Sequence, residues 1–349
     1  LAYFDRARKM AETAVSYGFV PALVVMWANY APDTFFSNRD GSCVMPEDAV
    51  RPYTELVVRT FGHLHPIYMV SGDVDFGSEA TVKTYETVLD TIRELAPDAL
   101  TTVHMFGERV LEEERLLRHE GLGFYMYQSG HMLSGQQQCY KMAESYLAKP
   151  VKRPIINGEP CYEGHGHGLR YGRYGAFDIR KAFWQSVLAG ASAGFTYGAH
   201  GVFSWHRRSA VFTSEEWSKI PFDANIALRL PGAWDAAYAK WLFETYDLFG
   251  LVPAGDRLVT EFEEIRVAVS PNLDKFAVYL PYVNRFELKL DLRRYDLVMF
   301  ELEGRNVFYP AFSSNGETSE VEMHDFNADA LLIGTLKTSE ESQHVDCRD

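Results

Sequence analysis

The sequence predicts an α/β protein in which parallel strands alternate with helices and a smaller antiparallel β-module follows. Up to residue 250, apolar runs of strand length alternate with segments of helical periodicity. Polar and aromatic residues follow these runs at their C-terminal ends, which is the layout of a (β/α)8 barrel of the TIM type. After residue 250, short runs with a period of two are split by turn residues, which is typical of an antiparallel sandwich.

The elements can be assigned in order. The first segment has apolar residues at helical spacing and ends at Gly18, a residue type common after helix C-termini. The next run, VPALVVMW at 20–27, is continuously apolar, so we expect a strand buried on both faces of a parallel sheet. Further strands are predicted at 66–73, 100–107, 123–131, 154–159 and 193–201. Helices are predicted at 46–61, 79–95, 109–119, 136–148, 177–192 and 234–248.

The predicted strand count does not close a barrel. The sequence contains about six parallel strands before residue 250, whereas a closed barrel has eight. We therefore expect the first β-α-β unit to be missing from the chain, which leaves Tyr3, Phe4, Met10 and Val15 in need of a surface to pack on. The predicted domains are a catalytic barrel at 1–250, a β-sandwich at 251–340 and a polar tail at 341–349.

Composition excludes several classes of partner. A net charge of −14 disfavours nucleic acid and anionic membranes, and no apolar run reaches the roughly 20 residues of a membrane span. No dinucleotide or phosphate-loop motif follows a strand, so no cofactor is expected.

The spacing of the four cysteines is not that of a metal site. We interpret them as free thiols, which favours a reducing, cytoplasmic compartment; they are Cys43, Cys139, Cys161 and Cys347. The localisation otherwise stays open, as does the oligomeric state, a homo-oligomer included.

Two carboxylates stand at the ends of predicted strands. Asp73 and Glu159 end strands on one face of the predicted barrel, three strands apart, so they would face each other across its mouth. Hydrolysis of a glycosidic bond needs such a pair, because one group protonates the leaving oxygen and the other attacks the anomeric carbon or activates water. Aromatic residues make up 14% of the chain, which suits either a large core or a cleft whose rings stack on sugars.

Five motifs follow one another along the chain: GD at 72–73, TTVH at 101–104, YQSGH at 127–131, NGEPCYEG at 157–164 and AGFTYGAHG at 193–201. In this order they resemble those of the apiosidase-like glycoside hydrolases, a bacterial (β/α)8 family with a small C-terminal β-domain. The resemblance implies a retaining glycosidase of plant or microbial glycans or glycosides, with Asp73 as acid/base and Glu159 as nucleophile. Many relatives carry a basic residue after the aspartate, whereas this chain has Val74 and Asp75, so Asp75 is the rival for the acid role.

Other residues at strand ends are candidates for binding the sugar. The histidines would donate to hydroxyl groups, Trp27, Tyr197 and Trp205 would stack on the sugar, and core packing is the competing interpretation for each. Glu163 is interpreted as a loop anchor. The full set of candidate substrate-binding residues is Trp27, Asp75, His104, Tyr127, Gln128, His131, Tyr197, His200 and Trp205.

Two other functions stay open. A carbohydrate-binding barrel without activity would need neither carboxylate. A metal-dependent hydrolase is suggested by His165-Gly166-His167, but such enzymes carry this motif after their first strand, and here it lies in a glycine-rich loop after a late one. No metal ligands are therefore predicted.

Overall fold

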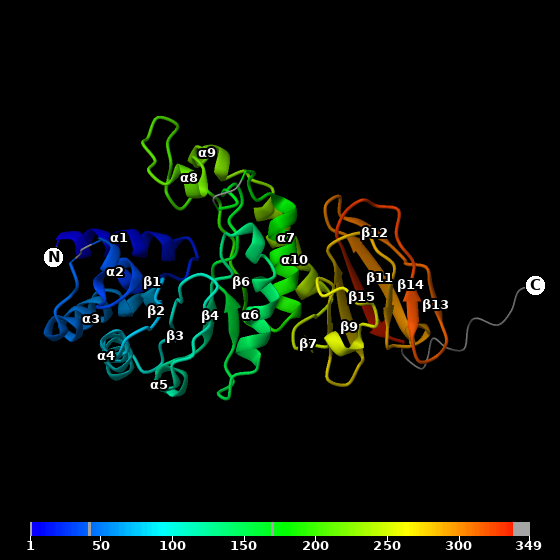
Figure 1. Cartoon of the computed structure of the whole chain (residues 1–349), viewed down its shortest axis with the longest axis horizontal. Coiled ribbons are helices and arrows are strands. Elements are labelled where there is room, and N and C mark those ends of the chain that lie inside the picture. Colours follow the sequence, from blue (N-terminus) through cyan, green and yellow to red (C-terminus); the bar gives the residue numbers. More distant parts are fainter. Residues whose placement is uncertain (1, 41–42, 169–170, 338–349) are drawn as a thin grey trace, which may run out of the picture. The chain divides into compact units, whose positions relative to one another are not determined.

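The computed structural model describes residues 2–40, 43–168 and 171–337 of the chain (Figure 1). It divides into two compact units, which are described separately. The first unit comprises residues 1–128 and 145–158, and the second comprises residues 129–144 together with residues 159 onward. The predicted polar tail at 341–349, Cys347 and the first residue lie outside the described residues.

The first unit contains five parallel strands. β1 (Ala22–Trp27), β2 (Ile67–Gly72) and β3 (Thr101–Thr102) form one sheet in that order. β4 (Tyr125–Tyr127) pairs in parallel with β5 (Ile155–Asn157). A parallel bridge between His104 and Met126 connects the chain after β3 to β4. The five strands therefore run in one direction, and the residues that follow them emerge at one end.

The helices of the first unit lie where the periodicity predicts them. α3 (Glu47–Phe61) and α4 (Glu79–Leu95) match the predicted segments and pack against each other. The Ser78 side chain caps α4 by accepting the N–H of Thr81. The helix expected at 109–119 is shorter than predicted. The remaining helices of this unit are α1 (Ala2–Ser16), α2 (Phe35–Asp40) and α5 (Glu114–Arg118).

The expected burial of β1 on both faces was wrong, whereas the missing β-α-β unit stays a prediction. Only Val25 and Met26 of β1 are buried, although burial on both faces was expected. In the described chain β1 pairs with β2 alone, so its side chains have a neighbouring strand on one side only. α1 does have a packing partner, because Phe4 contacts two aromatic rings of α3, while Tyr3 and Met10 are exposed.

The second unit begins its regular structure with helices. α7 (Ala176–Leu188) packs against α10 (Gly232–Thr245), and Figure 1 shows the two side by side. The short strand β6 (Gly194–Phe195) follows α7, and α8 (Glu215–Ser218) and α9 (Ala224–Ala227) precede α10. α6 (Gln138–Leu147) contains residues assigned to both units. The six strands β1–β6 lie at the six predicted positions, and their closure into a barrel stays a prediction.

The C-terminal part forms two antiparallel sheets that share a core, as the period of two predicts. Val278 and Leu332 of the larger sheet belong to the same buried cluster as Phe286 and Val321 of the smaller one. The larger sheet has the order β12-β11-β15-β9-β8-β7, and the smaller has the order β10-β14-β13. The bounds are β7 (Val252–Pro253), β8 (Arg266–Val269), β9 (Lys275–Leu280), β10 (Phe286–Leu288), β11 (Tyr295–Glu301), β12 (Asn306–Phe308), β13 (Phe312–Ser314), β14 (Ser319–Val321) and β15 (Ala330–Leu336).

The larger sheet is covered on its other face as well. Tyr279 of β9 and Phe300 of β11 pack in one buried cluster with Trp184 of α7 and Leu242 of α10. Alternate residues of β9 therefore face two different cores, and none of its interior positions faces water. The second unit contains these helices together with the sheets for this reason. The predicted boundary at residue 250, between a barrel domain and a sandwich domain, stays a prediction.

Two further findings concern the chemistry of the chain as a whole. No helix in the described ranges has the length and apolar character needed to cross a membrane. Cys43, Cys139 and Cys161 form no disulfide within the described residues, as their spacing predicted. The buried thiol of Cys139 instead lies 3.4 Å from the hydroxyl of Ser129.

Candidate active site

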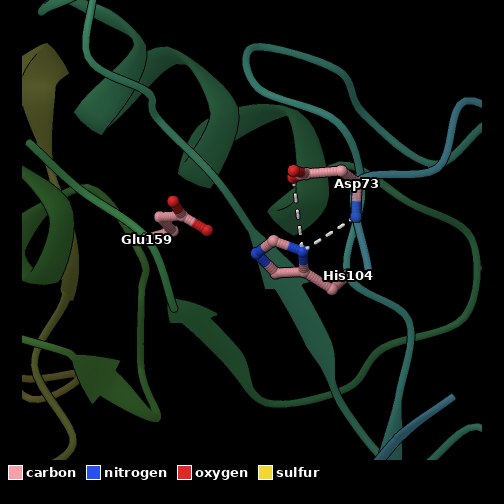
Figure 2. Close-up of side chains that lie close together, drawn as sticks. All are labelled: Asp73, His104 and Glu159. Carbon is pink, nitrogen blue, oxygen red and sulfur yellow. Dashed lines mark hydrogen bonds and ion pairs between the residues drawn. The ribbon is translucent and has the colours of Figure 1, made fainter. Parts of the chain in front are cut away.

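Asp73 follows β2 directly and has an unusual backbone conformation. Its φ is +51°, in the left-handed region that residues other than glycine seldom adopt. Its main-chain N–H donates to Nδ1 of His104 over 3.2 Å, and Figure 2 shows the carboxylate turned toward the same imidazole. The side chain is 20% exposed, so it is partly accessible to a ligand.

His104 is buried behind Asp73, and its tautomer follows from its contacts. Because Nδ1 accepts the N–H of Asp73, the proton of the neutral ring is carried on Nε2. Nδ1 lies 3.7 Å from Oδ1 of Asp73, which is too long for a hydrogen bond. The main chain of His104 is fixed by Ser71, whose hydroxyl accepts its N–H and donates to its carbonyl group.

Trp27 lies beside this imidazole. Its ring centroid is 6.2 Å from that of His104, and the indole is partly exposed at the end of β1. A Cβ atom at Gly72 would lie only 2.3 Å from the indole, so the ring can occupy this position only over a glycine. The first unit thus brings together Trp27, Asp73 and His104, three of the residues predicted from the sequence.

The other candidates in the first unit differ in burial. Tyr127 is fully buried, and its ring stacks on Tyr146, while its expected contact with substrate stays a prediction. Gln128 is also buried, and its main-chain carbonyl group accepts the N–H of Glu108. Asp75 is exposed on the loop after β2, separated from Asp73 by the buried Val74.

Glu159 belongs to the second unit and receives a hydrogen bond from His131. Nε2 of His131 lies 3.2 Å from Oε1 of Glu159, and the donor is the imidazole because an ionised carboxylate only accepts. The carbonyl group of Glu159 accepts the N–H of Gly130. The Glu159 side chain, drawn in Figure 2, is 17% exposed.

His131 is the first of three adjacent histidine rings, which we call the histidine row: His131, His165 and His200. The ring centroids of His131 and His165 are 4.5 Å apart and nearly parallel, and those of His165 and His200 are 5.0 Å apart. Burial, and next the charge of His131, lowers the pKa of His165 to about 3. Burial also lowers the pKa of His200, whose Nε2 donates to the carbonyl group of Lys219. Sequence reasoning missed this arrangement, because three separate loops supply the rings.

The motif His165-Gly166-His167 is explained by packing. Nδ1 of His165 donates to the carbonyl group of Gly166, whereas Nδ1 of His167 donates to that of Tyr171. The ring of His167 packs against Tyr174, away from the row. A Cβ atom at Gly166 would lie 3.0 Å from the main chain of Ser218, so the loop requires a glycine there. The two histidines have different surroundings and do not behave as a ligand pair.

Glu163 anchors its loop, as the sequence predicted. Its buried carboxylate accepts the hydroxyl of Tyr197 over 2.6 Å and the N–H of Gly232 over 2.9 Å. Burial raises the pKa of Glu163, although both hydrogen bonds act in the opposite direction. Tyr197 is therefore held as a hydrogen-bond donor to a carboxylate.

Trp205 is exposed and lies under the guanidinium group of Arg207, on a backbone with φ of +45°.

Comparisons with solved structures show the fold of the chain. A solved glycoside hydrolase superposes with a TM-score of 0.80 at 20% identity, over 96% of this chain and 77% of its own. A glycoside hydrolase of family 5 from Bacteroides vulgatus superposes with a TM-score of 0.79 at 20% identity, over 99% of this chain and 76% of its own. At this level of identity the two structures establish a shared fold. Comparison with curated protein sequences gives no match.

The family itself is established by a sequence model. Residues 1–250 match the catalytic domain described as apiosidase-like, which is well over half of the 349 residues. The five motifs that suggested this resemblance all lie within the matched range. The chain therefore belongs to the family of apiosidase-like glycoside hydrolases.

Proposed function

We propose that the protein is a retaining glycoside hydrolase in which Glu159 is the nucleophile and Asp73 the acid/base. The observation that carries the proposal is the bond from His131 to Glu159. A partly buried carboxylate that accepts from an imidazole N–H is oriented by it and favoured in its ionised form, as a nucleophile requires.

The strand order supports a catalytic role for each of the two carboxylates. β2, β3, β4 and β5 run in one direction within the first unit. Asp73 is the first residue after β2, and Glu159 is bonded to Gly158, which follows β5. Both carboxylates therefore follow the same ends of parallel strands, where enzymes built on such sheets place their reactive groups.

The chemistry proceeds in two steps. In the first, the Glu159 carboxylate forms a bond to the anomeric carbon while Asp73 gives its proton to the departing glycosidic oxygen. In the second, the ionised Asp73 takes a proton from water, whose oxygen replaces Glu159 at the same carbon. Each step breaks one bond to the anomeric carbon and forms another, so the configuration is retained overall.

The neighbouring residues fit a sugar ligand. We propose that the partly exposed ring of Trp27 stacks on a sugar face and that the Nε2–H of His104 donates to a hydroxyl group or to the reacting oxygen. The substrates are proposed to be plant or microbial glycans or glycosides. Apiosides are the first to test, because the family model carries that description.

Turnover of a panel of aryl glycosides tests the proposal. We expect Glu159→Gln to lower kcat by several orders of magnitude, because the amide keeps the shape of the side chain but cannot form the glycosyl ester. Glu244→Gln is the matched control, because it makes the same change at an exposed position of α10 and is expected to leave kcat nearly unchanged. Full activity in Glu159→Gln would refute the assignment, and sugar binding without turnover in the wild type would favour a carbohydrate-binding protein.

A further inference from the structure

Within the described residues, the side chain of His165 forms no hydrogen bond to another side chain. It nevertheless lies at the centre of the histidine row. One face of its ring covers His131, with centroids 4.5 Å apart and planes 28° apart. His200 packs against it with a centroid distance of 5.0 Å. His165 is buried, so its ring fills the space next to the imidazole that donates to Glu159.

We propose that His165 is a positioning residue for catalysis: its ring, stacked on His131, holds that imidazole in the orientation in which Nε2 donates to Glu159. This inference rests on the proposed function of Glu159. It assigns His165 a role through its aromatic face, with no contact to the substrate and no bound metal.

The position of the ring is fixed from the main chain. Tyr174 connects the two loops, because its N–H donates to the carbonyl group of His165 over 2.9 Å and its hydroxyl donates to that of His131 over 2.7 Å. Nδ1 of His165 donates to the carbonyl group of Gly166 over 2.7 Å, which determines the rotation of the ring. A single buried tyrosine therefore sets the distance between the two stacked histidines.

The protonation pattern is consistent with a purely aromatic role. Burial keeps the pKa of His165 at about 3, so at neutral pH the ring is uncharged and can cover His131 without repelling it. The donation to Glu159 uses the proton on Nε2 of His131, and its buried Nδ1 has no hydrogen-bond partner among the described residues. The ring of His131 is therefore oriented by its bond to Glu159 and by the two rings packed against it, His165 and Tyr162, each with its centroid 4.5 Å away.

A pair of variants separates the ring from its hydrogen bond. His165→Phe keeps the aromatic face and loses the donor to Gly166, whereas His165→Asn keeps a donor and loses the ring. We expect His165→Phe to remain within about threefold of the wild-type kcat, and His165→Asn to lower kcat about tenfold with KM within about twofold. His167→Asn is the matched control, because it makes the same change two residues away, outside the row.

An independent measurement does not depend on turnover. In protein labelled with ¹⁵N-histidine, NMR should show His131 with its proton on Nε2 in the wild type and in His165→Phe, and a mixture of tautomers in His165→Asn. Nδ1 protonation of His131 in the folded wild type would overturn the inference, as would full kcat in His165→Asn. If Glu159→Gln remained active, the proposed function would fail, while the tautomer of His131 would still report on the stack.

Discussion

The main-chain N–H of Asp73 donates to Nδ1 of His104, and this bond decides which nitrogen of the imidazole carries its proton. Asp73 makes this bond in the left-handed region, with φ of +51°. The hydroxyl of Ser71 fixes the main chain of His104 in turn. His104 therefore has two roles. Its Nδ1 holds the main chain of the proposed acid/base, Asp73, and its Nε2 presents a hydrogen-bond donor.

The first prediction concerns His104. His104→Phe removes the acceptor for the N–H of Asp73 and the Nε2 donor, so we expect kcat to fall by about 10- to 100-fold. His104→Asn can still offer an acceptor to that N–H, so it should lose less. Steady-state kinetics with a melting temperature for each variant checks this. Equal and full activity in both variants would show that the Asp73 backbone needs no such partner.

The second prediction concerns the role of Asp73. In Asp73→Asn the proton donor is lost, so glycosides with poor leaving groups should suffer a much larger fall in kcat/KM than activated aryl glycosides. A series of aryl glycosides with leaving groups of graded acidity measures this difference. The same loss on every leaving group would assign Asp73 to binding and make Asp75 the next candidate for the acid.

The third prediction concerns the buried Glu163. Burial raises its pKa in the folded state above the ordinary 4.5, so the folded protein binds the proton more tightly than the unfolded chain. The contribution of Glu163 is fully present below pH 4.5 and is lost as the pH rises through the folded-state pKa. Glu163→Gln cannot titrate, so its unfolding free energy should fall less steeply over this range. Urea unfolding at several pH values tests this, and parallel curves for both proteins would contradict it.

The fourth prediction concerns the buried ion cluster that joins α7 to α10 and to the chain before β15. Arg180 pairs with Asp235 at 3.0 Å and with Asp329 at 2.7 Å, and all three are almost fully buried. Arg180→Met leaves the buried carboxylate of Asp329 without its guanidinium partner and Asp235 with the longer 3.7 Å pair to Arg305, so we expect the free energy of unfolding to fall by about 3–5 kcal/mol. Arg118→Met, which breaks an exposed pair with Glu114, should leave the urea midpoint unchanged. Similar midpoints for both variants would contradict this.

Much of the fold could be predicted from the sequence because local patterns determine it. The periodicity of residues 79–95 gives α4 with its bounds, and Gly18 follows α1 with φ of +85°. The positions of Asp73 and Glu159 at strand ends were predicted from apolar runs that stop at a polar residue. Glu163 was predicted to anchor its loop for a similar reason, because it closely follows β5, the strand that precedes Glu159.

The rest depends on contacts between distant segments. The interior of β9 has no simple apolar–polar alternation, because α7 and α10 cover the face that a sandwich would expose to water. The stacking of the Tyr127 ring on Tyr146 likewise joins two segments that lie apart in the chain. The histidine row joins residues up to 69 positions apart in the chain, from His131 to His200, and no local pattern reports such stacking.

Rescue of Glu159→Ala by sodium azide tests the central claim most directly. In a retaining enzyme, azide takes the place of the missing carboxylate and attacks the anomeric carbon of an activated glycoside. We predict restored turnover and a glycosyl azide with the anomeric configuration opposite to that of the substrate, identified by NMR. Asp73→Ala with azide should instead give the configuration of the substrate, because azide then attacks the glycosyl enzyme. If Glu159→Ala were not rescued while Asp73→Ala gave the inverted azide, Asp73 would be the nucleophile and the account would be contradicted.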